Sequence, residues 1–443
     1  DGSQITLNFF GDVDFHYFED GGFTVVVSNG TYSYATLGPD GRLAPTEHLV
    51  GRSDPLESGL IPGLQPSTDT LAALLAVRAG PSAQRTSESL MRQRSGRPGA
   101  TTEKHLNVLC RFKDHTRDVH TRPPPDYRTQ WNRRGGDPSL APAGSVDDWI
   151  KENSYGKVGL STTVTRWVTL PHTEEYYAQG EYGFGEFPTN VQGLARDCLD
   201  AVDQFVDFGD FDEDNDGVID SITFTHSGYG AEYGGGAGSW IWSHTWSLWQ
   251  LPGEMWTSSD LNSNGEPVSV YRYQMLSAFR GVAGTEISSI GIGIWGYMFN
   301  YGAPLLRDGD GGGIGVGLYD VMGSSWGFDG TGDYPGYLSV WSKMNLGWIE
   351  PTVLSSPGRY GLQQAESFPE AYMIKRNFPD GEYLLIENRQ PVGFDSTMPQ
   401  GGLLIWHIDE AKTNQNEEGF PGQPGWPRNG QHYRVALLQA DGQ

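Results

Sequence analysis

The residues whose types and spacing most clearly suggest chemistry lie in an acidic loop at residues 212–220. The loop offers oxygen ligands at positions 1, 3, 5, 7 and 9 and a glycine at position 6: Asp212, Asp214, Asp216, Val218 (through its carbonyl), Asp220 and Gly217. This is the ligand spacing of an EF-hand-type calcium loop, in which hard oxygens surround a hard cation. Position 12 is Thr223 instead of a bidentate glutamate, and a strand is predicted to follow. We therefore predict a structural calcium site whose last ligand comes from elsewhere; the alternative is a solvated acidic turn.

The only two cysteines, Cys110 and Cys198, allow one disulfide and no thiolate zinc site. Cys110 lies in an apolar run that predicts a buried strand, and Cys198 lies in a helical pattern. A bridge and two buried free thiols both remain open. The sequon at Asn29 is a possible glycosylation site, and together with the acidic composition it favours a secreted protein.

Five of the 14 tryptophans gather in one short stretch: Trp240, Trp242, Trp246, Trp249 and Trp256. If exposed, the first four could stack on sugars or grip a partner. Packing in the core is the other interpretation, and it is the more usual fate of such residues. Two histidines, His226 and His244, could approach a carboxylate such as Glu232 and form a metal or acid–base site. Structural hydrogen bonds are the simpler role for them.

The composition limits what kind of protein can position these residues. A chain of 443 residues suggests two or three domains. Its net charge of −25 argues against nucleic acid as the main partner. With 61 glycines and 27 prolines it is expected to be rich in loops and short strands. No apolar run is long enough to predict a membrane span.

The hydrophobic periodicity predicts helices and strands in alternation, and therefore a mixed α/β (α+β) protein. Expected helices cover about 147–153, 191–205, 285–301 and 336–346, and expected strands cover 106–112, 160–170, 218–226, 383–388 and 402–407. Residues 1–50 alternate between glycine and aspartate turns and predict an antiparallel meander. We predict four regions: an N-terminal β-rich, propeptide-like block (1–70), a basic linker (71–103), a central domain (104–350) and a C-terminal β-rich region (351–443) that continues beyond this chain.

Several stretches, in this order, resemble the immune inhibitor A family of secreted zinc metallopeptidases. The main ones are 106–112, 144–157, the acidic loop with 226–228, 241–244, 319–323, 341–348, 385–390 and 402–409. The resemblance covers residues 104–443 well and the first block more loosely. It implies a zincin- or metzincin-like fold, with a twisted mixed sheet, an active-site helix and a β-rich region behind them.

A protease of this kind needs H-E-x-x-H on its active-site helix, because two histidines one turn apart hold Zn²⁺ and the glutamate acts as general base. The matching frame in this chain keeps three framework positions, Gly302, Pro304 and Asp308. The positions that would bind or use zinc hold Trp295, Gly296, Phe299 and Leu305. No histidine occurs between His244 and His407, so no register gives a helical two-histidine site in this region.

The sequence thus predicts a catalytically inactive, metallopeptidase-like extracellular protein, stabilised by calcium and without zinc. It would have a structural or binding role with a protein or glycan partner, for example as an assembly subunit, and no nucleic acid or membrane span. One alternative is an active secreted metallopeptidase that hydrolyses proteins. Another is a glycan- or peptide-binding module that uses the vestigial cleft and the tryptophans.

Overall fold

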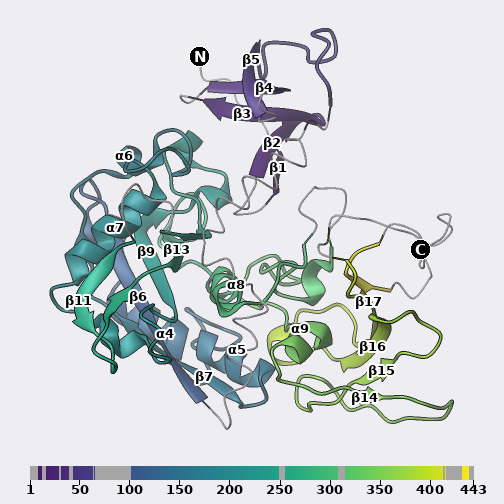
Figure 1. Cartoon of the computed structure of the whole chain (residues 1–443). Coiled ribbons are helices and arrows are strands. Elements are labelled where there is room, and N and C mark those ends of the chain that lie inside the picture. The colour runs from purple at the N-terminus through teal and green to yellow at the C-terminus, as the bar shows by residue number, and fades with distance from the viewer. Residues whose placement is uncertain are drawn as a thin grey trace. The chain divides into compact units, whose positions relative to one another are not determined.

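The protein is described by a computed structural model and divides into two compact units, each built from several chain segments (Figure 1). Unit 1 comprises Asp1–Gln84, Val108–Arg122 and Thr165–Ile287, and unit 2 comprises Arg85–Asn107, Pro123–Val164 and Ser288–Gln443. The domain boundaries expected from the sequence are a different division and stay predictions. The structure describes residues 8–11, 16–28, 31–38, 43–62, 64, 101–248, 255–307, 315–412, 415 and 432–438.

Unit 1 begins with the antiparallel meander that the sequence predicts, drawn in purple in Figure 1. Its five strands pair in chain order: β1 (Asn8–Gly11), β2 (His16–Asp20), β3 (Phe23–Ser28), β4 (Thr31–Leu37) and β5 (Leu43–Leu49). A small core of Phe23, Val25, Tyr34 and Val50 fills one face, where alternate residues of β3 and β4 meet. Gly21 and Gly22 have positive φ and make the turn between β2 and β3.

A second sheet is mixed, with strand order β10-β13-β9-β6-β7 and β8 beside β6. Its strands are β6 (Thr101–Arg111), β7 (Val158–Val164), β8 (Val168–Thr169), β9 (Ile222–Tyr229), β10 (His244–Ser247) and β13 (Arg272–Phe279). β10 is antiparallel to β13, whereas β13 and β9 are parallel. Nearly every residue of β9 and β13 is buried, as expected for strands covered on both faces.

The expected strand at 160–170 is divided into β7 and β8 by three residues that do not pair. Thr165 lies in this gap, and its hydroxyl accepts a hydrogen bond from the backbone N–H of Leu109 (3.0 Å). A two-stranded hairpin, β11 (Thr257–Leu261) and β12 (Pro267–Ser269), follows β10 in the chain.

Helix α5 (Val146–Asn153) begins with a complete capping box, as the sequence predicts: Ser145 and Asp148 each accept a hydrogen bond from the other's backbone N–H. Helix α7 (Val191–Val202) is capped by Asn190, whose side chain accepts hydrogen bonds from the N–H groups of Gln192 and Gly193. Among the described residues, the other α-helices before α8 are α3 (Arg117–His120), α4 (Pro124–Asn132) and α6 (Glu174–Ala178).

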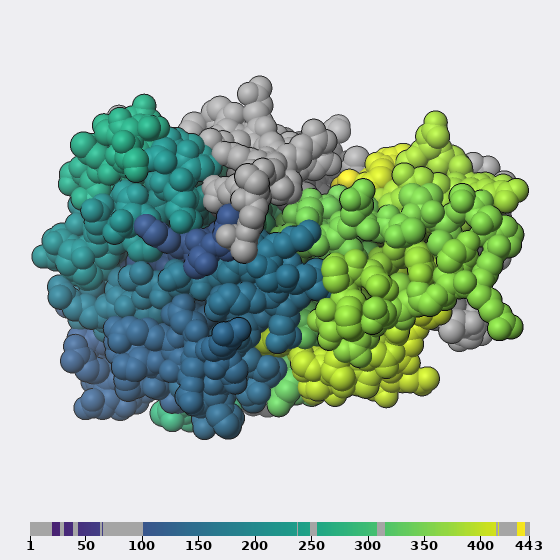
Figure 2. All heavy atoms as spheres, turned by 90° about the horizontal axis from the view of Figure 1, so that it is seen from below, coloured from purple at the N-terminus to yellow at the C-terminus, as the bar shows by residue number. Residues whose placement is uncertain are grey.

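In unit 2, helices α8 (Ile290–Tyr301) and α9 (Val340–Asn345) precede the C-terminal sheet. The sheet pairs in the order β14 (Thr352–Val353), β15 (Tyr372–Ile374), β16 (Glu382–Arg389), β17 (Gly402–Asp409) and β18 (Val435–Leu437). In the space-filling view, this region forms a continuous surface of light green and yellow atoms (Figure 2). Together the sheets and helices confirm the predicted mixed α+β class. None of the helices in the described part of the chain is long and apolar enough to cross a bilayer.

Candidate functional site

The acidic loop brings three carboxylates together. One ligand oxygen from each of Asp212, Asp214 and Asp216 lies within 4.8 Å of the other two. Asp212 is buried, and its carboxylate accepts hydrogen bonds from the N–H groups of Asp216 (3.0 Å) and Gly217 (2.9 Å). Carboxylates this close repel each other unless a cation or a proton lies among them. The donor set therefore fits a hard cation such as Ca²⁺.

Asp220, also predicted as a ligand, makes hydrogen bonds within the loop. Its carboxylate accepts a hydrogen bond from the N–H of Glu213 (2.8 Å), and its own N–H donates to the carbonyl of Phe211 (2.9 Å). The N–H of Val218 donates to Asp216 (2.9 Å), which shapes the turn after Gly217. The structure thus groups three of the five predicted calcium ligands and uses Asp220 to close the loop.

The turn of the β11–β12 hairpin is tied to this loop by three hydrogen bonds. The side-chain amide of Asn262 donates to Asp212 (2.8 Å). The N–H of Ser263 donates to the side chain of Asn215 (2.9 Å), and the side-chain amide of Asn264 donates to the carbonyl of Asn215 (3.2 Å). The sequence did not predict these contacts, because the partners are 48 to 50 residues apart.

Helix α8 carries the positions at which the sequence comparison expected a lost zinc site. Trp295 and Phe299, one turn apart, are half-buried, and their nearly parallel rings have centroids 6.1 Å apart. The guanidinium carbon of Arg307 lies 5.8 Å from the centroid of the Trp295 ring. Gly296 is buried, and Leu305 follows the helix. The helix contains no histidine, cysteine, aspartate or glutamate at all.

The tryptophan cluster does not form one surface. Trp256 is buried and donates to Asp200 (2.7 Å), so it is part of the core. Trp240 stacks on Tyr229, and a Cβ atom on Gly235 or Gly236 would collide with its ring. Trp242 and Trp246 are half-buried and pack against aromatic residues of a preceding loop, Tyr182 and Phe184. Trp249 and the sequon residue Asn29 lie outside the described residues.

His226, His244 and Glu232 each bind other groups. His226 is fully buried, which lowers its pKa to about 3, and its Nδ1 lies 3.0 Å from the carbonyl of Ser227. The ring of His244 contacts the carbonyl of Trp242 (2.7 Å) and the hydroxyl of Tyr273 (3.3 Å). Glu232 accepts hydrogen bonds from the backbone and hydroxyl of Ser243 (3.0 and 2.6 Å). These contacts support the structural interpretation of the three residues.

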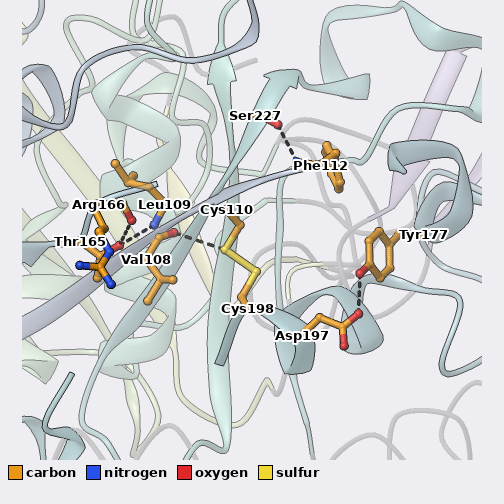
Figure 3. Close-up of a disulfide and its surroundings, with 10 residues drawn as sticks. All are labelled: Val108, Leu109, Cys110, Phe112, Thr165, Arg166, Tyr177, Asp197, Cys198 and Ser227. Atoms are coloured by element: carbon orange, nitrogen blue, oxygen red, sulfur yellow. Dashed lines mark hydrogen bonds between the residues drawn. A yellow bond between two sulfur atoms is a disulfide. The ribbon is translucent and has the colours of Figure 1, made fainter. Parts of the chain in front are cut away.

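The two cysteines are joined by a disulfide, which connects strand β6 to helix α7 (Figure 3). Both residues are fully buried, and the bond closes a sequence separation of 88 residues. Directly before Cys198 in α7, Asp197 accepts a hydrogen bond from the hydroxyl of Tyr177 (2.5 Å). Beyond Cys110, the N–H of Phe112 donates to the hydroxyl of Ser227 (3.1 Å).

Unit 2 contains a buried network of charged side chains that the sequence did not reveal. Arg389 is fully buried and forms a two-pronged ion pair with Asp395, and its guanidinium lies 3.7 Å from both Glu366 and Glu387. Burial alone would lower the pKa of Arg389, but these carboxylates raise it above its usual value. Burial raises the pKa of Glu387 despite the nearby cations.

Lys343 of helix α9 belongs to the same network. Burial lowers its pKa to about 8, although Glu387 opposes the shift. Its ammonium group donates to the hydroxyl of Tyr155 (3.3 Å) and lies 5.0 and 5.3 Å from the ring centroids of Tyr155 and Tyr337. The only sequence signal for this cluster was a set of charged residues inside otherwise apolar stretches.

Part of the chain is similar in sequence to known peptidases. Residues 141–349 match the immune inhibitor A peptidase M6 catalytic domain. Over this region the chain is similar to the immune inhibitor A family. One relative, immune inhibitor A of Bacillus thuringiensis subsp. alesti, is 26% identical over 388 residues, which cover 80% of this chain and 51% of the relative. The chain therefore spans about half the length of that relative.

The match to this catalytic domain makes the chain metallopeptidase-like, and M6 peptidases depend on zinc. In this immune inhibitor A-like chain the residues on α8 do not fit that metal. An indole N–H only donates hydrogen bonds, and glycine and phenylalanine side chains offer no lone pair to a metal ion. We therefore derive no catalytic step through zinc at Trp295, Gly296 and Phe299.

Proposed function

We propose that this protein is a catalytically inactive, immune inhibitor A-like protein that serves a structural or binding role outside the cell. The observation that carries the proposal is the composition of helix α8, where two stacked aromatic rings occupy the positions that the sequence resemblance assigns to the zinc-binding histidines. A general base is missing as well, because Gly296 stands where the glutamate would be. A metal-bound water has neither a ligand set nor a proton acceptor on this helix.

Calcium is the metal that we propose instead, held by Asp212, Asp214 and Asp216 with the carbonyl of Val218. The clustering of three carboxylates within 4.8 Å supports this assignment. Such an ion would stabilise the fold, because it binds the assembled loop and not the unfolded chain. Asp220 would contribute by shaping the loop, through its hydrogen bond from Glu213.

An extracellular location is part of the same proposal. The buried disulfide between Cys110 and Cys198 supports it, because such bonds form and persist mainly in oxidising compartments. Asn29 is proposed as a glycosylation site because it begins the sequon Asn29-Gly30-Thr31. The first 70 residues are proposed as a propeptide-like block.

A glycan- or peptide-binding module is the second candidate. The half-buried side chains of Trp242 and Trp246 favour it, since partly exposed tryptophans are common anchors of binding surfaces. Trp256 does not support it, because it is buried, and Trp240 is half-buried with its ring stacked on Tyr229. The partner would be a protein or a glycan, and neither nucleic acid nor a membrane is proposed.

Elemental analysis of the purified protein, combined with a casein hydrolysis assay, tests the proposal. We expect calcium, no stoichiometric zinc, and no hydrolysis that a chelator abolishes. One tightly held zinc ion per chain, or chelator-sensitive proteolysis, would overturn the inactive reading and favour an active metallopeptidase. An array of oligosaccharides and peptides would identify compounds that bind the protein, and each of these would then be tested for quenching of the tryptophan fluorescence. Quenching that is lost in Trp242→Ala or Trp246→Ala would support the second candidate.

A further inference from the structure

The turn of the β11–β12 hairpin holds an asparagine–glycine pair in an exposed position. Asn264 and Gly265 are both exposed, and Gly265 has a φ of +78° with no atom within 4 Å of the position that a Cβ would occupy. We propose that Asn264 is a site of spontaneous modification, at which its side-chain amide is converted to a carboxylate. The conversion would cut one of the three ties between the hairpin and the acidic loop.

The chemistry needs only the chain itself and water. The backbone nitrogen of Gly265 loses its proton to solvent and attacks the side-chain carbonyl carbon of Asn264. A carbon–nitrogen bond forms, the side-chain nitrogen leaves as ammonia, and a five-membered succinimide remains. Water then opens the ring at one of its two carbonyls, which gives aspartate or isoaspartate. Glycine at the second position permits this attack because it has no side chain to block the approach.

Two hydrogen bonds of the turn slow the attack without preventing it. The N–H of Gly265 donates to the carbonyl of Asn262 (2.9 Å), and the side-chain amide of Asn264 donates to the carbonyl of Asn215 (3.2 Å). The reaction therefore proceeds from the fraction of molecules in which the turn is open. A net hydrogen bond lowers such a fraction about two- to fivefold, so two of them lower it by roughly 5- to 30-fold.

The product changes the contact with the acidic loop. The amide of Asn264 is the donor to Asn215, and a carboxylate at this position can only accept. It would place another negative charge beside Asn215, which lies between Asp214 and Asp216 in the loop. The bond from Ser263 to Asn215 would be weakened with it, whereas the more deeply buried bond from Asn262 to Asp212 would remain.

Peptide mapping by mass spectrometry tests the site. The folded protein is incubated at mildly alkaline pH beside a sample unfolded in urea, and both are digested at intervals. We expect conversion at Asn264 in the folded protein, roughly 5- to 30-fold slower than in the unfolded one. Asn377 is an internal control, because it is also exposed but is followed by the bulky Phe378. Full protection of Asn264, or equal conversion of Asn377, would overturn the proposal.

A pair of variants tests the consequence separately. Asn264→Asp reproduces one product, and Asn264→Gln keeps the amide but disfavours the five-membered ring. We expect faster hydrogen exchange at the N–H of Ser263 in Asn264→Asp than in Asn264→Gln. The same exchange rate in both variants would show that the contact with Asn215 does not hold the turn, and the proposed consequence would be wrong.

Discussion

Removal of the disulfide gives the most direct test of how the protein is stabilised. The double variant Cys110→Ala/Cys198→Ala frees a loop of 88 residues in the unfolded chain. The loop-entropy relation gives about 15 cal/mol/K for a loop of this length, or about 4–5 kcal/mol of unfolding free energy at 25 °C. Both cysteines are fully buried, so the loss of their sulfur atoms also weakens the packing of the core and lowers the unfolding free energy by a smaller amount.

Equilibrium unfolding in urea, followed by tryptophan fluorescence, measures this difference. Reduced wild-type protein is the control, because it keeps both sulfur atoms and loses only the bond. We expect the reduced protein to lie far below the oxidised one in stability and close to the alanine variant. Two titratable thiols in the purified native protein, or an oxidised midpoint equal to the reduced one, would refute the reasoning and the extracellular argument built on it.

Three further outcomes follow from the structure. Chelation of calcium should lower the melting temperature, and the loss of stability should be about 2.7 kcal/mol if the metal had been present at a hundredfold excess over its Kd. Asp214→Ala should remove most of that response. An unchanged melting curve would show that the loop is only a solvated turn. Arg389→Met should cost about 3–5 kcal/mol in urea unfolding, because it strands buried carboxylates, and near-neutral behaviour would show that they take up protons instead. Burial lowers the pKa values of His105 and His226 to about 3, so between about pH 6.5 and 3 the unfolded state binds more protons than the folded one. Stability should therefore decrease as the pH is lowered through this window, by about 1.4 kcal/mol per pH unit for each imidazole. His105→Gln should make the measured dependence of stability on pH less steep.

Local signals in the sequence predicted the elements best. The capping box at Ser145 fixed the start of α5, and the apolar runs at 383–388 and 402–407 identified β16 and β17 to within two residues. Thr189 and Asn190 both precede α7 and could cap it by residue type, and Asn190 is the one that accepts from the first turn. An amide oxygen and a hydroxyl compete for the same N–H groups, and the sequence did not show which one the backbone would place there.

Other boundaries depended on contacts that are distant in the sequence. Helix α9 was expected to begin after Pro335, but it begins at Val340, where the hydroxyl of Ser339 accepts from the N–H of Ser342. The side chain of Asp320 fixes Ser339 in this position by accepting from its N–H (2.8 Å). The strand at β6 begins at Thr101, because its first residues pair with β7 even though they are polar. Pairing partners more than 50 residues away leave no trace in local periodicity.

The buried charges around Arg389 have a consequence for how such proteins are recognised. Lys343 and Glu387 lie in two of the stretches that resemble the family, and they hold the core together without touching helix α8's altered positions in any contact described above. Their replacement would destabilise the protein whether or not it cleaves anything. Sequence similarity at such residues indicates a shared fold, and a fold can be retained in a protein that does not retain the catalytic activity.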